Sequence, residues 1–333
     1  MDKTNLPIND LITICVATYN RRELLCATIE SILSQTYKNL QIIIVDDYSS
    51  DDTEQFVKEN ILGRDKRVVY IRHNENKGLA AARNTAIFQA EGKFYTFCDD
   101  DDRWEKEFIE KFVKLARHYD AGWCFACGGK YTNALGTIVS MTNDVEYALR
   151  EYIQLGYTPP VASQFYFVES LRKAGGYNEA LRSGIDHDLW LRLAKLNVKI
   201  KTIPIPMSIQ NSSIDVDRIT TNYHTRISGI KASLKIWRDD LVVMYGVEFY
   251  NQYSQAYLER EKLFLLNLYL TEGQIIEALK NINDLPLIKA SVIMFRVLLK
   301  WAIKKCIPSI FFPSEKTCNI LPAIQVSGYD SSI

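Results

Sequence analysis

QIIIVDD, residues 41–47, is a β-branched apolar run that ends in two acids, a pattern typical of a buried parallel strand. Similar runs lie on both sides of it in the chain: LITICVAT at 11–18, RVVYIR at 67–72 and KFYTFC at 93–98. Helical spacing or Ala-rich sequence separates these strands, at 22–35, 52–60, 79–90 and 105–119. The alternation predicts an α/β fold with a doubly wound, mainly parallel sheet flanked by helices.

The chain beyond residue 120 follows other patterns. Short strands punctuated by Gly and Pro run from about 122 to 180, and a strong helix follows at 187–196. Beyond about residue 225 the sequence is helical. We therefore expect two parts, an α/β domain over residues 1–225 and a helical C-terminal region over 226–333.

Composition narrows the class of protein. The 333 residues have ordinary globular composition and a formal net charge of zero, so a nucleic acid is not an expected partner. The seven cysteines are odd in number and lie mostly in apolar runs, which favours reduced thiols in the cytosol. Cys124 and Cys127 form a lone CxxC, whereas a structural zinc site needs four ligands, so zinc is disfavoured.

Membrane insertion is not expected from the sequence. The N-terminal residues MDKTNLPIND lack the apolar core of a signal peptide, and no run approaches the roughly 18 uncharged residues of a spanning helix. We expect the protein in the cytoplasm or peripherally on the inner face of the cell membrane.

Polar residues follow each predicted strand. In open parallel sheets, ligands bind beyond the carboxyl ends of the strands, so these residues are expected to share one edge. They are Thr18-Tyr19-Asn20-Arg21, Asp46-Asp47, His73-Asn74 and Asp99 to Asp102.

The four adjacent aspartates at 99–102 are the sharpest of these signals. Their mutual repulsion favours a bound cation, and carboxylate oxygens suit Mg²⁺ or Mn²⁺. If the strand continues through them, Asp99 and Asp101 point to one side and could hold one ion. An EF-hand starting at Asp99 is excluded because Trp104 stands where the loop needs glycine. The alternative is a solvated loop in which an aspartate, Asp102 in particular, caps the next helix.

The other clusters each have two interpretations. Residues 18–21 and 46–53 could form a ligand site or only turns and helix caps. Arg83 falls mid-helix, where it is either exposed or placed to bind phosphate. Asp186 and Asp188 are two residues apart and cannot share a helix face, so one could act as a general base. Two N-terminal caps are the alternative for this pair.

Taken in order, the motifs resemble the family 2 glycosyltransferases of the GT-A fold. They are VATYNR, SILSQTY, IIIVDDYSSDDT, NENKGLAAARNTAI, FCDDDDRW and GGYNEALRSGIDHDLWLRLA, and they span roughly residues 10–205. The resemblance implies an inverting hexosyltransferase or N-acetylhexosaminyltransferase of bacterial polysaccharide or lipopolysaccharide assembly. It also implies a nucleotide-sugar donor, UDP-linked, with Mn²⁺ or Mg²⁺, and a saccharide or lipid-linked saccharide acceptor.

The resemblance also implies a role for each matching residue at the nucleotide. Thr18 and Tyr19 match positions that contact the base, and Asp47 matches the acid that accepts a hydrogen bond from uracil. Arg83 matches a basic residue beside the nucleotide. The expected nucleotide-binding set is completed by Asn20, Arg21, Asn76, Gly78, Asp99 and Asp100.

For the metal and the chemistry, the implied residues lie in two motifs. Asp99 and Asp101 match the Asp-x-Asp motif that touches the ribose and the metal on the diphosphate. Asp186 matches the catalytic base, which would take the proton of the acceptor hydroxyl. Trp190 and Arg192 match the helix that follows it.

The sequence departs from the family pattern in three places. Ala17 stands where proline is common, and Ile185 replaces the usual Glu before Asp186. Residues 207–213, MSIQNSS, lack the Arg and the metal-binding His that the family often supplies, for which His224, Asp215 or Asp217 could substitute. The last two departures favour one alternative, a non-catalytic nucleotide-sugar-binding or scaffold protein. A nucleotidyltransferase is the other alternative, although that class usually has a Gly-rich phosphate loop after the first strand, where this chain has Tyr-Asn-Arg-Arg at 19–22.

Residues 286–313 form a basic amphipathic segment. Lys289, Arg296, Lys300 and Lys304 fall in one stripe of an otherwise apolar helix, and the segment contains no acid. This suits an interfacial helix on an anionic membrane. A helix that packs its apolar face on the rest of the protein is the alternative.

Overall fold

The computed structural model describes residues 9–133, 136–140, 144–154, 163–211, 223–271, 274–280 and 293–294. Its strands are β1 Ile12–Thr18, β2 Leu40–Asp46, β3 Val68–Arg72, β4 Phe94–Phe97, β5 Asp102–Trp104, β6 Trp123–Asn133, β7 Gly136–Ser140, β8 Val145–Ala148, β9 Gln164–Phe167 and β10 Lys199–Asn211. Its helices are α1 Arg22–Leu33, α2 Thr53–Val57 with a π-helical turn Lys58–Leu62, α3 Leu79–Gln89, α4 Phe108–Ala116, α5 Leu149–Gln154, α6 Val168–Lys173, α7 Ile185–Lys195, α8 Tyr223–Tyr245, α9 Val247–Thr271 and α10 Ile275–Lys280.

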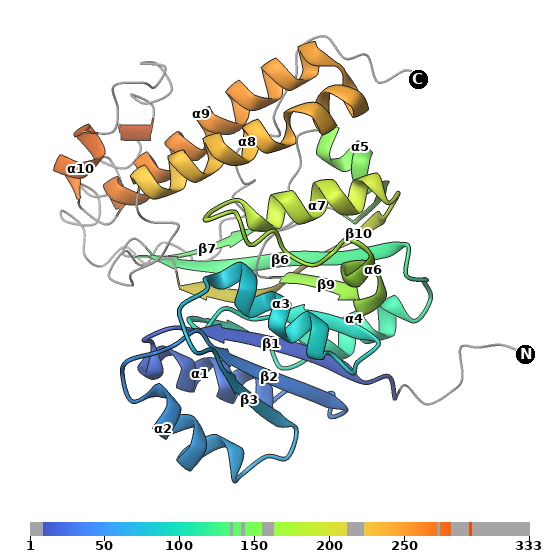
Figure 1. Ribbon diagram of the computed structural model, residues 1–333, viewed down its shortest axis with the longest axis vertical. Helices are drawn as coiled ribbons and strands as arrows, with labels where there is room; N and C mark the ends of the chain where they lie inside the picture. The colour runs from blue at the N-terminus through green and yellow to red at the C-terminus, as the bar shows by residue number, and fades with distance from the viewer. Residues whose placement is uncertain are drawn as a thin grey trace, which may run out of the picture.

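One sheet organises the molecule, with strand order β3-β2-β1-β4-β9-β6-β10-β5 (Figure 1). Strands β3, β2, β1 and β4 are parallel, and β6 is parallel to β10. The register pairs Thr18 with Asp46 and Asp46 with Arg72, so β1, β2 and β3 end side by side. The predicted α/β fold and its four N-terminal parallel strands are confirmed. Strands β5, β8 and β10 were not predicted.

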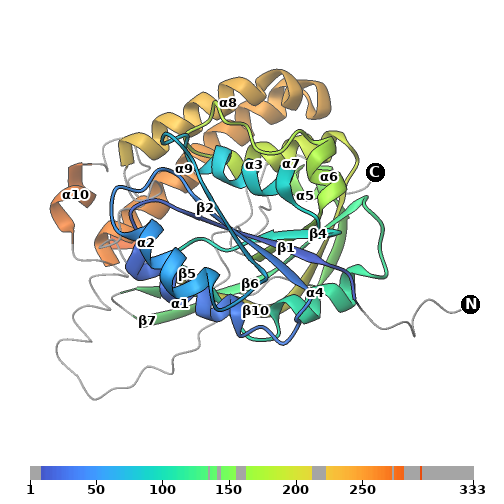
Figure 2. The same ribbon diagram turned by 60° about the horizontal axis from the view of Figure 1, so that its bottom comes forward.

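Helices cover both faces of the sheet, as Figure 2 shows, and each face has its own core. Because the strands are buried on both sides, neighbouring residues enter opposite cores, with Ile42 and Ile44 in one and Ile43 and Val45 in the other. The first core is filled from α1 and α4, and the second from α3, α7, α8 and α9. This explains why the strands read as continuous apolar runs without alternation.

The α8–α9 hairpin lies along α7 in both views (Figures 1 and 2). Small residues bring α8 close: a Cβ added at Gly229 would stand 2.6 Å from Ser183 Cβ, and Ser233 Oγ donates to Ser183 O at 3.1 Å. The aromatic residues Trp237 and Tyr253 enter the core shared with α3 and α7. The hairpin therefore supports the segment from which α7 starts.

The division of the chain into two parts at residue 225 stays a prediction.

Within the part of the chain described, none of the helices combines the length and the apolar character that crossing a bilayer requires. The basic segment 286–313 lies outside the described residues, apart from 293–294.

Candidate active site

The turns that follow β1 and β2 are bonded to each other. Asn20 takes a left-handed conformation with φ of 53°, and its backbone N–H donates to Ser49 Oγ at 2.9 Å. Its side-chain oxygen accepts from the backbone N–H of Ser50 at 2.6 Å. Tyr19, beside it, is 45% exposed. Asn20 therefore holds the turns after β1 and β2 together, and Tyr19 is an accessible residue at the same edge of the sheet.

Asp47 is buried and holds the loop that leads into α3. Its oxygens accept from the backbone N–H groups of Lys77 at 2.9 Å and Gly78 at 2.7 Å, and His73 Nδ1 lies 2.7 Å from Oδ1. Gly78 has a φ of 90°, a conformation that glycine tolerates at a helix start. Asn76 is exposed in the same loop. Asp47 thus orders the loop at the end of β3, and its contact with a base stays a prediction.

The aspartates form a turn between β4 and β5, in which Asp102 is the first residue of β5, and the expectation that they continue the preceding strand is wrong. Strand β4 ends at Phe97, and Asp102 N donates to Asp99 O at 3.0 Å. The alternation that would place Asp99 with Asp101 does not apply. Asp102 begins β5, and the residue that precedes α4 is Glu107, so Asp102 does not cap that helix.

Within this turn, Asp100 and Asp101 face the end of β1. Asp100 Oδ2 accepts from Thr18 Oγ1 at 2.8 Å, and Asp100 Oδ1 accepts from Arg21 Nη1 at 2.9 Å. The same Arg21 nitrogen lies 3.5 Å from Asp101 Oδ2. Burial raises the pKa of Asp100 to about 6, against the opposing charge of Arg21. The bonds of Asp100 to Thr18 and Arg21 therefore tie the acidic turn to the carboxyl end of β1.

Asp99 faces the other way, toward Arg83. The guanidinium of Arg83 donates to Asp99 Oδ1 at 2.7 Å and to Asp186 Oδ1 at 2.9 Å. It lies 3.7 Å from the centroid of the Phe97 ring, and Arg83 is 1% exposed. Burial alone would lower the pKa of Arg83, but the charges of Asp186 and Asp99 raise it well above its usual range. Arg83 is a buried cation that joins two carboxylates.

The interpretation of Arg83 as an exposed mid-helix residue is therefore wrong. Helix α3 is covered on the sheet side and also by the segment after α6, because Asn84 bonds Tyr177 and Glu179 there. Residues 80–84 are all buried.

Asp186 lies in the first turn of α7, which begins after Gly184. Its Oδ1 accepts from Arg83 and lies 3.4 Å from the Tyr177 hydroxyl, and its side chain is 16% exposed. Burial raises the pKa of Asp186, while Arg83 opposes the rise. Asp188 instead binds Trp237 Nε1 at 2.9 Å and Arg192 Nε at 2.8 Å. Neither carboxylate bonds a described backbone N–H, so the interpretation of both as caps is wrong.

Trp190 and Arg192 are residues of α7 that bond this helix to β9 and to the segment after α6. Trp190 Nε1 donates to the Tyr166 hydroxyl at 3.0 Å, and Arg192 Nη1 donates to Gly176 O at 2.6 Å. Tyr177, next to that glycine, is a site residue that the expected set does not include, although it lies in the family motif GGYN. The Gly-Gly pair is the sequence signal for this residue: both glycines have positive φ, 79° and 71°, and they come directly before Tyr177, whose ring centroid lies 5.3 Å from Arg83 Cζ.

The substitutes suggested for the missing family residues divide into two groups. His224 lies in the first turn of α8, and Asp215 and Asp217 lie outside the described residues. Gln210 of β10 pairs with Asp102 of β5, so the described part of MSIQNSS does run beside the acidic turn.

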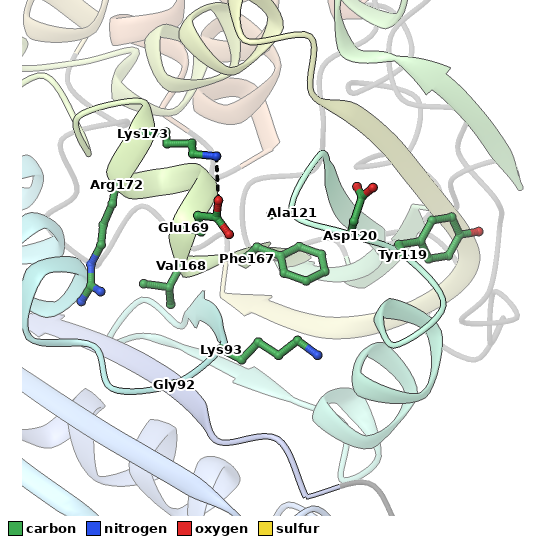
Figure 3. A pocket seen from close by; sticks show the side chains of 10 residues that line it. All are labelled: Gly92, Lys93, Tyr119, Asp120, Ala121, Phe167, Val168, Glu169, Arg172 and Lys173. Carbon is green, nitrogen blue, oxygen red and sulfur yellow. Dashed lines mark ion pairs between the residues drawn. The ribbon is translucent and has the colours of Figure 1, made fainter. Parts of the chain in front are cut away.

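A separate hollow of about 780 Å³ lies at the opposite edge of the sheet (Figure 3). It is lined by residues just before β4, such as Lys93, and by residues of α6, where Glu169 and Lys173 form an ion pair of 2.6 Å. It contains none of the predicted site residues. The chemistry-bearing groups gather instead at the carboxyl edge of β1, β2 and β4.

Solved structures share this architecture. One is Staphylococcus aureus TarS, residues 1–349, in complex with UDP-GlcNAc, with 17% identity, a TM-score of 0.55, and coverage of 80% of this chain and 88% of that chain. Another is the mannosyltransferase PcManGT from Pyrobaculum calidifontis, in complex with GDP-Man and Mn²⁺, with 17% identity, a TM-score of 0.55, and coverage of 90% and 87%. At this identity the likeness shows the fold, which is that of the GT-A glycosyltransferases.

Sequence relatives agree with this fold. A glucosyltransferase of Escherichia coli, named as acting with UDP-Glc on α-D-GlcNAc-diphosphoundecaprenol, is 45% identical over 95 residues, 28% of this chain and 37% of the relative. An uncharacterised glycosyltransferase of Rickettsia conorii is 29% identical over 281 residues, 83% of this chain and 43% of the relative. The chain thus spans less than half the length of these relatives.

The sequence model of the family described as Glycosyl transferase family 2 matches residues 13–174. This range runs from β1 through α6 and contains the acidic turn and Arg83. The predicted resemblance is therefore confirmed, and residues 13–174 of the chain belong to glycosyl transferase family 2.

Proposed function

We propose that the chain transfers a sugar from a UDP-sugar to a hydroxyl of a lipid-linked saccharide. The observation that carries this proposal is the position of Arg83, which joins Asp99 of the acidic turn to Asp186 of α7 through one guanidinium. In this proposal Asp99 would hold the divalent cation that binds the donor diphosphate, and Asp186 would accept the proton of the acceptor hydroxyl. The names of relatives support the acceptor class, since the Escherichia coli and Campylobacter jejuni relatives are named for undecaprenol-diphosphate-linked saccharides.

Asp186 is the proposed general base. It takes the proton of the acceptor hydroxyl as that oxygen bonds to the anomeric carbon, while the bond from this carbon to the diphosphate breaks on the opposite face. The configuration inverts, and a nucleoside diphosphate leaves. Burial raises the pKa of Asp186 and so makes it a stronger base, and its exposed edge leaves room for an acceptor. Arg83 and the Tyr177 hydroxyl orient the carboxylate.

The acidic turn fits a divalent cation shared with the substrate. Among the described residues no group of three or more His, Cys, Asp or Glu side chains could enclose a metal ion. Asp99 is 34% exposed, and its Oδ2 bonds no described residue, so it offers an oxygen ligand to an ion held mainly by phosphates and water. Asp101 is the second proposed ligand, and it would have to turn away from Arg21 to reach the same ion. Bound Mn²⁺ or Mg²⁺ would supply positive charge at the leaving diphosphate.

A panel of nucleotide-sugars tests the proposal. Donor binding is measured by calorimetry with and without Mn²⁺, and transfer is measured with a polyprenyl-diphosphate-linked sugar as acceptor. We expect metal-dependent binding of a UDP-sugar and transfer with inverted configuration. If the protein binds the donor but neither transfers the sugar nor hydrolyses the donor, the non-catalytic alternative is favoured. Release of pyrophosphate from a nucleoside triphosphate would favour a nucleotidyltransferase.

A further inference from the structure

Tyr48 has an unusual backbone conformation at the carboxyl end of β2. Its φ is 72°, a region that bulky residues rarely adopt, and it directly follows Asp47. The other described non-glycine residues with positive φ are Asn20 and Asn197, and asparagine tolerates this region well. Tyr48 is also 47% exposed as a whole residue, so burial does not explain an aromatic residue at this position. A strained, exposed ring at a binding edge indicates a function in that edge.

One face of the Tyr48 ring is already supported. Arg72 Cζ lies 5.1 Å from the ring centroid. Arg72 is itself fixed, because its Nη2 donates to Ser49 O at 2.8 Å and its Nε lies 3.3 Å from Glu54 Oε2. The guanidinium therefore restrains the ring from one side, while Tyr48 as a residue remains exposed.

The Tyr48 turn lies within the proposed nucleotide site. Hydrogen bonds between Asn20 and residues 49–50 tie it to the turn that carries Tyr19, the other exposed tyrosine of this edge. The preceding residue, Asp47, bonds the loop that starts α3. Two accessible aromatic rings thus stand on adjacent turns beyond the parallel strands, where a planar ligand would be bound.

We propose that the Tyr48 ring stacks on the base of the donor nucleotide, with Arg72 behind it. This inference rests on the proposed function and adds a base-binding residue to that site. Every nucleobase has a flat face, so the stack contributes affinity without selecting the base. The charge of Arg72 below the ring holds its plane fixed, which lowers the entropy lost when the base binds.

Three variants and two ligands test the stack. Tyr48→Gly removes the ring and accepts the positive φ, Tyr48→Phe keeps the ring, and Asn197→Gly is a control with the same backbone region far from this edge. Calorimetry with Mn²⁺ compares UDP with pyrophosphate, which has no base. We expect Tyr48→Gly to bind UDP about 5- to 100-fold more weakly. Its pyrophosphate affinity should stay that of the wild type, and Tyr48→Phe and Asn197→Gly should bind both ligands normally.

Two results would overturn the stack alone. Either Tyr48→Gly binds UDP as tightly as the wild type, or it loses UDP and pyrophosphate affinity equally, which would mean that the turn and not the ring matters. Thermal melting of each variant verifies that it is folded. If the wild-type protein binds neither UDP nor GDP, the proposed function fails and the stack with it, a result distinct from a failure of Tyr48 alone.

Discussion

Arg83 Nη1 donates to Asp186 Oδ1 at 2.9 Å, although the two residues are 103 positions apart in the chain. The pair joins α3, which follows the third strand, to α7, which lies beyond the family-matched segment. Because the other arm of Arg83 binds Asp99, the arginine sets the distance between the acidic turn and the candidate base. A shift of α3 or of α7 would therefore change the position of Asp186 relative to the acidic turn.

Loss of the Arg83 charge should disturb both the fold and the pH profile. Arg83→Met leaves two carboxylates facing each other without a cation, at a cost of at most about 3–5 kcal/mol of stability. Arg83 lowers the pKa of Asp186, so its removal raises that pKa, and the acidic limb of the kcat/KM profile should move to higher pH. Arg64→Met, at an exposed position, is the control in unfolding and rate measurements. If the acidic limb of the kcat/KM profile stays at the same pH in a folded Arg83→Met variant, Asp186 is not the group whose titration sets that limb.

Gly176 and Gly175 form a matched pair for a stability measurement. Both have positive φ, but a Cβ at Gly176 would stand 2.4 Å from Asn84 Oδ1, whereas a Cβ at Gly175 meets nothing within 4 Å. Gly175→Ala should cost only the backbone strain, about 1 kcal/mol. Gly176→Ala should cost about 1–3 kcal/mol more, because it displaces the Asn84 side chain that holds Tyr177. Equal midpoints of urea unfolding for the two variants would show that the Asn84 side chain moves away from the new Cβ at position 176 at no cost in stability.

His187 should make stability fall in mild acid. It is buried among Trp237, Tyr253 and Tyr257, and its Nε2 bonds the Tyr253 hydroxyl. Burial, with a smaller contribution from Arg260, lowers the pKa of His187 from 6.5 to about 3. The unfolded chain therefore binds a proton that the folded protein does not, and stability is lost as pH falls from about 6.5 toward 3.

The measurement is urea unfolding at pH 7 and pH 5. From this residue we expect a loss of about 2 kcal/mol in the wild type that is missing in His187→Gln. His118→Gln, at an exposed position, should keep the wild-type loss. The same pH dependence in all three proteins would mean that His187 does not stay neutral when folded.

Asp101 should govern the metal dependence of donor binding. Asp101→Ala removes one proposed oxygen ligand, so UDP-sugar affinity in Mn²⁺ should fall about 10-fold or more, while affinity in EDTA should match the wild type. Asp120→Asn, at the opposite edge of the sheet, should leave both affinities unchanged. A metal response that persists in Asp101→Ala would assign the ion to other ligands.

Much of the N-terminal half could be predicted because its strands are buried on both faces and each ends in polar residues. The pattern that places Thr18, Asp47 and Asp99 at one edge is local, since Thr18 is the last residue of its strand and Asp47 and Asp99 follow theirs by one and two residues. Strand β10 could not be predicted in the same way. Its sequence mixes Lys, Pro and Ser, and it is stabilised by three neighbouring strands that come from distant parts of the chain.

The partners of the site residues were the least predictable part. Whether Arg83 is exposed depends on Asn84 bonding Tyr177 and Glu179, more than 90 positions later, which no local pattern records. The direction of each aspartate in the turn likewise depends on where Arg21 and Arg83 stand in the folded protein. The sequence spacing identifies the candidate site residues, whereas ion pairs between residues far apart in the chain determine the direction of their side chains.

Turnover by Asp186→Asn, measured together with its donor affinity, decides whether Asp186 is the base. Asparagine keeps the shape of the side chain but cannot take the acceptor proton, so we expect kcat to fall about 10²- to 10⁴-fold while UDP-sugar still binds. Asp120→Asn should turn over at the wild-type rate. Wild-type turnover by a folded Asp186→Asn protein would contradict the assignment of the base and the mechanism built on it.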